Sequence, residues 1–280
     1  MKLPKNMVNL IYQNIKIYKY INISINFYSK MKKISYIYIY FGIVVILIIY
    51  SQKSENFSNK NTTNIYLTAQ DTIVFIRNDT DNYIKSLSEY DLIARDVSSP
   101  FEYISNIING CLTFNTNQIE KLDNCSTIAR KFFDNKIIWK FALVNDIYEQ
   151  GFPHTRTDII FLSPKLLDYM DNNLIKILIH ESVHIYQRYN KSAINKYLKE
   201  HGYSVSRRRD SEPFIRANPD LDEYIYTNKE GEEMIYKYKS SMSTGINDII
   251  PSDNEHPFET MAYEIDEEYG KFNLSKYKNI

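Results

Sequence analysis

The 280-residue chain contains little glycine, cysteine and histidine, with 7, 2 and 5 residues respectively. It shows no internal repeat and no long Gly/Pro linker, which excludes solenoid and low-complexity architectures. Lys plus Arg and Asp plus Glu both number 34, so the formal net charge is zero. This balance gives no electrostatic reason to expect nucleic acid as a partner. With 44% hydrophobic residues, the chain can bury the core of one domain with an appendage.

The two cysteines, Cys111 and Cys125, do not have the Cys-x-x-Cys spacing that is typical of metal-binding cysteines. They are therefore poor candidates for metal ligands. A single disulfide in an oxidising compartment and a pair of buried free thiols both remain open.

One uncharged hydrophobic run lies near the N-terminus, at residues 34–50. Its length is at the short end of what spans a hydrocarbon core of about 30 Å, and tyrosines at both ends suit the interfacial aromatic belt. Lys30, Lys32 and Lys33 precede it. We expect a single-pass signal-anchor with residues 1–33 in the cytoplasm and the C-terminal domain lumenal or extracellular. A buried core helix and a cleaved signal peptide are the alternatives.

The segment on each side of this run has a simple interpretation. Residues 51–63 are rich in Ser, Asn and Lys and predict a flexible stalk. The folded domain is then expected over residues 64–280. Met31 stands directly before two lysines and the apolar run, which suggests the hypothesis that translation begins there.

Hydrophobic periodicity and capping residues predict both helices and strands in this domain. The expected strands are 65–67, 72–77, 137–144 and 158–162. The expected helices are 80–94, 100–109, 116–133, 164–170, a helix capped by Asp171 or Asn172, 193–200, and a helix beginning at Pro257. The sequence therefore predicts an α+β domain that is mostly helical and has a small mixed sheet, in addition to the transmembrane helix.

The clearest chemical motif is His180-Glu181-Ser182-Val183-His184, within the helix that begins at 171 or 172. Residues i and i+4 lie on one helix face, so both imidazoles can reach one Zn²⁺ ion. Glu181 then points toward the water that such an ion carries, where a general base is needed. The preceding turns are apolar, which predicts a buried wall for the site. A helix whose histidines only make hydrogen bonds is the alternative interpretation.

This motif resembles that of the zincin metallopeptidases. The metzincin continuation is absent, because Ile-Tyr-Gln-Arg-Tyr follows His184. A later helix with a glutamate, as in gluzincins, fits better, and Glu259-Thr-Met-Ala262 resembles the Glu-x-x-Ala segment of that group. The resemblance implies a zincin-like domain that binds one Zn²⁺ ion through His180, His184 and Glu259. Glu255, His256 and Glu264 are alternative third ligands. His154 and His201 are expected to be ordinary polar histidines, although His154 could reach the cleft from the loop before the edge strand.

The resemblance also suggests parts that contact a substrate. In zincins the edge strand before the metal-binding helix pairs with the bound peptide. Here that strand would consist of Asp158, Ile159, Ile160, Phe161 and Leu162, and an ordinary sheet strand is the alternative. A phenol that stabilises the oxyanion could come from Tyr263, Tyr224 or Tyr226.

The sequence thus predicts a membrane-anchored, zinc-dependent metallopeptidase that acts on a peptide or protein substrate. One alternative is a degenerate zincin that serves as a membrane-tethered binding or structural protein. Another is a zinc hydrolase of a non-peptide amide. The shape of the cleft separates the enzymes, because an extended groove along 158–162 favours peptides and a round pocket favours a small substrate.

Overall fold

The computed structural model describes residues 64–133 and 136–272, which all belong to one unit of the chain, Thr63–Ile280. The strands in it are β1 (Ile65–Tyr66), β2 (Cys111–Leu112), β3 (Lys140–Val144), β4 (His154–Arg156), β5 (Ile159–Leu162), β6 (Ser204–Arg208) and β7 (Tyr224–Thr227). The α-helices are α2 (Ala69–Asn78), α3 (Glu89–Ile93), α4 (Pro100–Ile108), α5 (Thr116–Phe132), α6 (Pro164–Leu167), α7 (Asp171–Tyr189), α8 (Lys191–His201) and α9 (Pro257–Phe272). The 3₁₀ helices are η1 (Ile84–Ser86), η2 (Tyr148–Gly151) and η3 (Arg209–Ser211).

The predicted cytoplasmic segment (1–33), transmembrane anchor (34–50) and stalk (51–63) lie outside the described residues. The hypothesis that translation begins at Met31 concerns the same part of the chain. Among the residues that are described, no helix is both long enough and apolar enough to cross a membrane.

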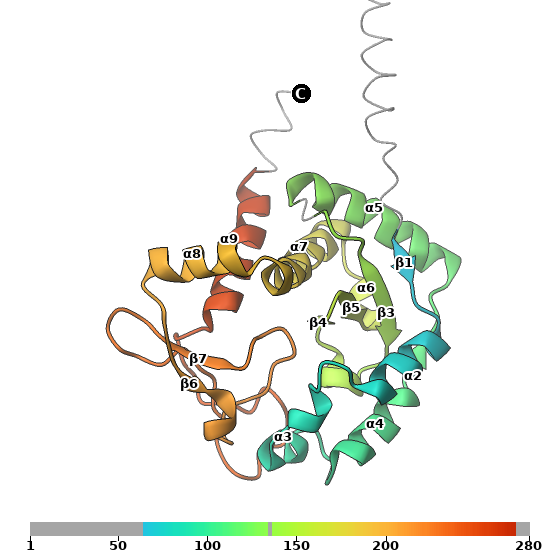
Figure 1. Cartoon of the computed structure of the whole chain (residues 1–280). Coiled ribbons are helices and arrows are strands. Elements are labelled where there is room, and N and C mark those ends of the chain that lie inside the picture. Colours follow the sequence, from blue (N-terminus) through green and yellow to red (C-terminus); the bar gives the residue numbers. More distant parts are fainter. Residues whose placement is uncertain (1–63, 134–135, 273–280) are drawn as a thin grey trace, which may run out of the picture. The chain divides into compact units, whose positions relative to one another are not determined.

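Five short strands form a small mixed sheet (Figure 1). β3 is central, because β5 lies parallel along one edge while β1 and β2 pair with the other, β1 parallel and β2 antiparallel. β4 completes the sheet as the antiparallel neighbour of β5. A second sheet contains only β6 and β7, which pair antiparallel. The predicted α+β class with a small mixed sheet is confirmed.

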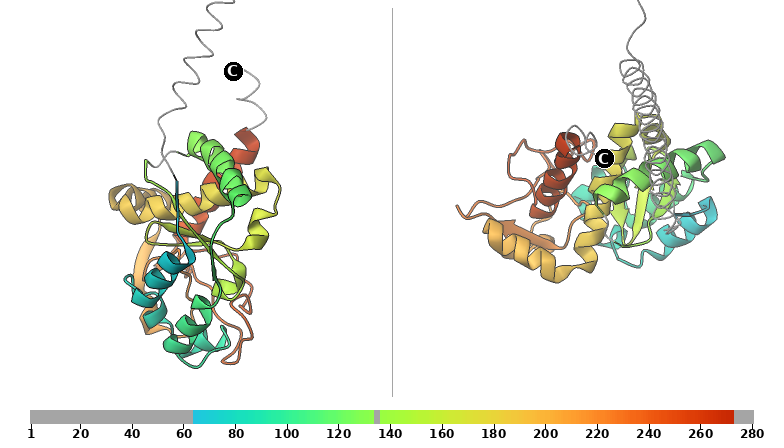
Figure 2. Two further views of the ribbon diagram at one scale, coloured as in Figure 1. Left: turned by 90° about the vertical axis from the view of Figure 1, so that its right-hand side faces the viewer. Right: turned by 90° about the horizontal axis from the view of Figure 1, so that it is seen from above.

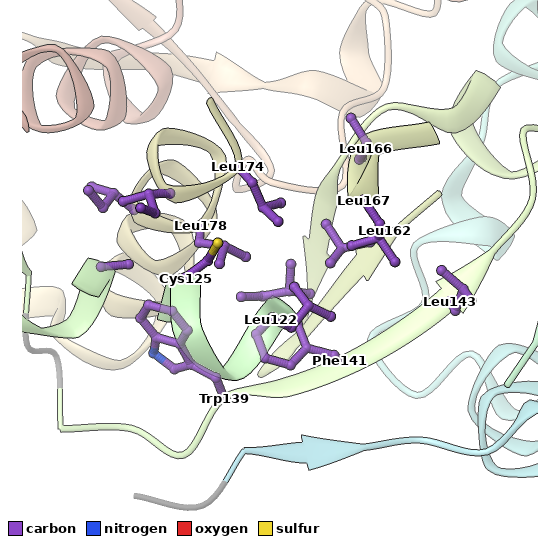
Figure 3. Close-up of a cluster of buried hydrophobic side chains, with 14 of the residues drawn as sticks. Leu122, Cys125, Trp139, Phe141, Leu143, Leu162, Leu166, Leu167, Leu174 and Leu178 are labelled. Carbon is purple, nitrogen blue, oxygen red and sulfur yellow. The ribbon is translucent and has the colours of Figure 1, made fainter. Parts of the chain in front are cut away.

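Side chains alternate along the central strands and enter two hydrophobic clusters, one on each face of the sheet. Phe141 and Leu143 of β3 pack with residues of α5, α6 and α7, as Figure 3 shows. Ala142 and Val144 belong to the second cluster, which includes residues of α2 and α4. Because both faces are covered by helices, these strands read as continuous apolar runs in the sequence.

Helix α7, which carries the His-Glu-x-x-His motif, lies between α5 and α9 (Figure 1 and Figure 2). In its N-terminal half, Leu174, Ile175 and Leu178 are buried in the hydrophobic cluster that also contains residues of the sheet and of α5. These contacts fix the rotation of α7 about its own axis. The histidine face is consequently presented to α9.

The segment 72–77 is helical, so the predicted strand there is wrong. The hydroxyl of Thr68 accepts a hydrogen bond from the backbone N–H of Asp71, and the Asp71 side chain accepts one from the backbone of Thr68. This capping box starts α2, and Thr72 and Ile76 are buried one turn apart. Local capping thus outweighs the β-propensity of the Thr-Ile-Val-Phe-Ile run. The predicted helix over 80–94 is also shorter, being divided into η1 and α3.

The two cysteines are free thiols, so the disulfide alternative is wrong. Cys125 is buried in the cluster shown in Figure 3, and Cys111 is half-buried on β2. Burial raises the pKa of both thiols to about 11. Thiols with such a pKa are mainly protonated and unreactive at neutral pH, so both residues serve packing.

Candidate metal centre

Three side chains from two helices converge at the motif. His180 and His184 lie one turn apart on α7, with ring centroids 4.8 Å apart. Glu259 enters from the first turn of α9, and its Oε2 atom lies 3.1 Å from His180 Nε2 and 3.5 Å from His184 Nε2. One possible ligand atom from each residue lies within 4.8 Å of the other two. The three side chains could therefore hold one metal ion.

The sequence of α9 explains why Glu259 reaches α7. Pro257 takes the first helical position, where the N–H that proline lacks would have no partner within the helix. Ala262 is fully buried, and its small side chain allows α9 to approach α7 closely. The first turn is also the favoured place for a carboxylate, because the N-terminal end of a helix carries partial positive charge.

Both histidines are oriented by a hydrogen bond at Nδ1. His180 Nδ1 lies 2.9 Å from Asp266 Oδ2, and His184 Nδ1 lies 3.0 Å from Gln187 Oε1. Because the two acceptors are oxygens, the proton resides on Nδ1 in the neutral rings. The Nε2 lone pairs are then left for a metal ion, as is common for metal-binding histidines.

Further contacts fix the side chains of Glu259 and Asp266 and join α7 to α9. Asn218 Nδ2 donates to Glu259 Oε1 at 2.6 Å, which leaves Oε2 directed at the histidines. Gln187 Nε2 donates to the backbone oxygen of Phe258 at 2.8 Å and so ties α9 to α7. Lys176 Nζ lies 3.3 Å from Asp266 Oδ1. Each candidate ligand is therefore supported by a second residue, as metal sites require.

The closely spaced imidazoles and carboxylates shift one another's pKa values. Burial lowers the pKa of His180, but its contacts with Asp266 and Glu259 outweigh burial and raise the pKa to about 11, so a metal ion would replace the Nε2 proton of this ring when it binds. Burial raises the pKa of Glu259, yet the facing rings of His184 and His180 lower it well below its usual range. Glu259 therefore carries its negative charge, which is the form that binds a metal ion.

Two buried polar atoms of the motif have no hydrogen-bond partner among the described residues, namely His184 Nε2 and Glu181 Oε2. Nearly all buried polar atoms in native proteins are paired, so such exceptions require an explanation. His184 Nε2 is the atom through which His184 would bind a metal ion. The fully buried, unpaired ring nitrogen beside two further ligand atoms fits the presence of such an ion.

Glu181 has the surroundings of a proton-transferring group. Its side chain is buried and lines the cavity described next. Burial, together with the negative charge of nearby Asp220, raises the pKa of Glu181 well above its usual value. A carboxyl group with a raised pKa can accept and release a proton more readily near neutral pH.

We call His180, His184 and Glu259 the metal group. A cavity of about 620 Å³ adjoins it, and the lining of the cavity includes His180, Glu181 and Glu259. Tyr263 lies beside them, with its ring centroid 4.7 Å from that of His180. The segment Arg216–Asp220 also lines the cavity. The volume lies within the range of about 300–1,000 Å³ that is usual for ligand pockets.

The three tyrosines proposed as oxyanion stabilisers have different positions, and the assignments of Tyr224 and Tyr226 are corrected. Tyr263 lines the cavity. Tyr226 donates its hydroxyl to Asp222 at 2.7 Å, and Tyr224 packs against the guanidinium of Arg208. Among the described residues that line the cavity, neither Tyr224 nor Tyr226 is found.

The alternative third ligands lie outside the group of three. Glu255 lines the cavity but accepts a hydrogen bond from Tyr236 at 2.5 Å. His256 is buried beside the rings of Tyr226 and Phe258. Glu264 accepts a hydrogen bond from the Tyr197 hydroxyl at 3.0 Å.

The two remaining histidines are not part of the metal group. His154 lines the cavity from β4, where it is buried and stacked on Phe161. Burial lowers the pKa of His154, so the ring is neutral at pH 7. His201 is exposed at the end of α8.

The prediction that 158–162 is the edge strand is wrong. β5 lies inside the sheet between β3 and β4, and Asp158 precedes it in the turn. The edge strand on this side of the sheet is β4, and its outer side is closed at Thr155. Thr155 N donates to Asp220 Oδ1 at 2.6 Å, and Thr155 O accepts a hydrogen bond from Arg188 at 3.0 Å. A peptide cannot add to the sheet at Thr155 while these bonds persist.

No family model, curated protein or solved structure matches the chain. The resemblance to zincins consequently depends on the motif and on the geometry around it.

Three supporting residues escaped the sequence reasoning. Asp266 lies two turns after Glu259 on α9, and Gln187 lies one turn after His184 on α7, so helical spacing could have indicated both. Asn218 comes from an irregular segment distant in sequence. No local pattern connects it with Glu259.

Proposed function

We propose that the protein is a zinc-dependent metallopeptidase of the zincin type. His180, His184 and Glu259 would bind one Zn²⁺ ion, and Glu181 would be the general base. The convergence of three ligand atoms within 4.8 Å, next to a buried carboxyl with an unpaired oxygen, is the observation that carries the proposal. Two imidazoles and one carboxylate form a ligand set known from catalytic zinc sites, which leave a further position open.

The roles of the residues follow from their positions. A bound zinc ion supplies Lewis acidity, which polarises a carbonyl group and makes water more acidic. Glu181 accepts the proton of the attacking water and passes it to the leaving amine. Asp266 and Gln187 keep the imidazoles in the tautomer whose Nε2 atoms face the metal.

Tyr263 is the proposed donor to the charge that develops on the carbonyl oxygen of the substrate. It lines the cavity beside His180. The partial burial of Tyr263, which is 48% exposed, and the neighbouring Glu259 raise its pKa to about 12, so the phenol keeps its proton at neutral pH. A protonated phenol is the form that can stabilise an oxyanion.

The closed outer side of β4 favours a second candidate, a zinc hydrolase of a non-peptide amide. Such a substrate would enter the cavity without pairing with the sheet. The complete set of three ligand atoms supports an enzyme over a degenerate zincin that acts as a membrane-tethered binding or structural protein. Peptide hydrolysis remains the preferred proposal because the motif resembles that of the zincins.

We also propose that residues 34–50 anchor the protein in a membrane as a single pass. The uncharged run and the lysines before it support a cytoplasmic N-terminus and a lumenal or extracellular domain. Protease treatment of sealed vesicles tests this orientation. A domain over 64–280 that is digested from the cytoplasmic side would contradict it.

The test of activity uses the full-length protein and a mixed peptide library, with products identified by mass spectrometry. We expect cleavage by the zinc-loaded protein and a loss of about 10²–10⁴-fold in Glu181→Gln, the range typical of general-base removal. The variant should keep its zinc, because Glu181 is not a ligand. Undiminished cleavage by Glu181→Gln would refute the assigned base, and cleavage of non-peptide amides alone would favour the second candidate.

A further inference from the structure

The cavity beside the metal group contains a guanidinium group that binds no anion. Arg216 lines the cavity, with its guanidinium carbon 5.4 Å from the ring centroid of Tyr236. Within the described residues, this guanidinium makes no hydrogen bond and no ion pair within 4.0 Å. Burial raises the pKa of Glu255, and the nearby charge of Arg216 partly offsets this rise. Lys176, the other lysine or arginine of the lining, is paired with Asp266 at 3.3 Å. The cavity therefore contains one guanidinium whose N–H groups make no hydrogen bond with the described residues, beside the carboxylate of Glu255.

The backbone and the aromatic platform of Arg216 are both fixed. Arg216 N donates to the backbone oxygen of Tyr236 at 2.9 Å, and Ala217 N donates to the buried carboxylate of Asp91 at 2.8 Å. The Tyr236 hydroxyl donates to Glu255 Oε2 at 2.5 Å, which holds the ring on which the guanidinium stacks. A side chain held in this way loses little freedom when it binds a ligand.

Arg216 also lies close to the metal group along the chain. Asn218, two residues later, donates to Glu259 Oε1 at 2.6 Å. Two residues of chain span at most about 7 Å, so the segment that holds Arg216 reaches one of the metal ligands directly. Both Arg216 and Glu259 line the same cavity. A molecule that contacts the metal group can therefore extend to the guanidinium.

We propose that Arg216 determines specificity by binding a carboxylate group of the substrate next to the metal group. This inference deepens the proposed function and rests on it. A guanidinium binds a carboxylate through two parallel hydrogen bonds, and stacking on Tyr236 leaves its N–H edge free for them. The carboxylate belongs either to a free C-terminus or to an acidic side chain. The closed outer side of β4 agrees with a substrate that is held by a charged group instead of by strand pairing.

The test measures binding by calorimetry and does not depend on hydrolysis. The probes are the monohydroxamates of malonic, succinic, glutaric and adipic acids, each paired with its methyl ester, on the zinc-loaded full-length protein. Each pair carries the same metal-binding group and differs only in the carboxylate. At the best tether length, we expect the acid to bind about 10- to 100-fold more tightly than the ester, as for a hydrogen-bonded charge pair.

The variants assign this preference to one residue. Arg216→Gln should bind acid and ester equally, and Arg216→Lys should keep part of the preference. Arg77→Gln, which removes an exposed arginine on α2, should keep all of it. An acid preference that survives in Arg216→Gln would overturn the assignment, as would equal binding of acid and ester at every tether length by the wild-type protein.

A second measurement separates this proposal from the zinc proposal. The Nε–H NMR signal of Arg216, assigned by its loss in Arg216→Gln, is followed in metal-free protein during titration with N-acetylalanine. A shift that N-acetylalaninamide does not cause supports the carboxylate site even if the protein binds no zinc. Absence of any shift, combined with equal hydroxamate binding or none, would overturn it.

Short peptides then identify the source of the carboxylate through their affinity for Glu181→Gln. A free C-terminus with neutral side chains is compared with an amidated peptide that contains glutamate and with an amidated neutral peptide. Tighter binding of the first identifies a C-terminal carboxylate, and tighter binding of the second identifies an acidic side chain. Equal binding of all three would contradict the proposal.

Discussion

Two buried carboxylates in the same domain, Glu149 and Glu181, have opposite surroundings. Glu149 accepts hydrogen bonds from the guanidinium of Arg95, at 2.6 and 3.1 Å, and from the hydroxyls of Tyr83 and Tyr103. Glu181 has an oxygen with no described partner and lies near Asp220, a second negative charge. The satisfied carboxylate belongs to a structural network. The unsatisfied one marks the site where chemistry is proposed.

The largest difference in stability is expected between isosteric substitutions of these two residues. Glu149→Gln should lower the free energy of unfolding by about 3 kcal/mol, because it removes the nearer of the two buried carboxylates that face the guanidinium of Arg95 and leaves only Asp91 at 3.8 Å. Glu181→Gln replaces a carboxyl that has one unpaired oxygen and should leave stability unchanged or slightly higher. Urea unfolding in the presence of a chelator measures both. Equal losses in the two variants would contradict the comparison.

Zinc should stabilise the domain by binding to His180, His184 and Glu259 beside Glu181. Free zinc at about 100 times its dissociation constant adds roughly 2.7 kcal/mol to the free energy of unfolding if it binds only the folded state. His184→Ala should lose this gain. His201→Ala is the matched control, since His201 is exposed on α8 and distant in sequence from the motif, and it should keep the gain. Loss in both variants would indicate unspecific binding.

The residues that orient the ligands should have a smaller effect on zinc affinity. Asp266→Asn removes the charge that faces His180 Nδ1 and should weaken zinc binding by about 10- to 100-fold. Glu264→Gln changes a carboxylate on the same helix that contacts Tyr197 instead. Competition with a fluorescent chelator measures both affinities. If the two variants bind zinc alike, Asp266 has no orienting role.

The smallest predicted effect is the acid sensitivity that Glu149 contributes. Burial raises the pKa of Glu149, but the charge of Arg95 outweighs it and lowers the pKa below the ordinary value of 4.5. The folded state therefore binds fewer protons than the unfolded state, and stability is lost as the pH falls below about 4.5 toward the folded-state pKa. The slope for one proton is at most about 1.4 kcal/mol per pH unit. Glu149→Gln should show a shallower loss in this range, and an unchanged slope would exclude this contribution.

The sequence predicted those features of the fold that depend on local signals. The helices α4 and α5 and the start of α9 at Pro257 agree with the capping residues and apolar spacing. Helix α7 agrees with the apolar spacing, but its N-cap position is Met170, which makes no side-chain cap, and not Asp171 or Asn172. The predicted strand at 72–77 is wrong because the Thr68–Asp71 capping box outweighs the β-propensity of this β-branched run. β4 was missed because His-Thr-Arg has no apolar alternation, although all three side chains are buried by tertiary contacts.

The candidate site likewise contains some residues that local sequence signals reveal and others that they do not. His180, Glu181 and His184 are set by one helical turn, and Glu259 was found through resemblance to a second motif. The contacts of Asn218 and Arg216 join segments that are far apart in sequence, so no spacing rule reveals them. The position of β5 inside the sheet likewise follows from strand order, which the local pattern does not determine.

The most direct test of the central claim is the zinc content of the folded, full-length protein after zinc loading and dialysis. We predict one zinc ion per chain in the wild-type protein and in Glu181→Gln, with loss in His184→Ala. Elemental analysis combined with protein quantification gives the ratio. Folded wild-type protein that retains no zinc would contradict the account.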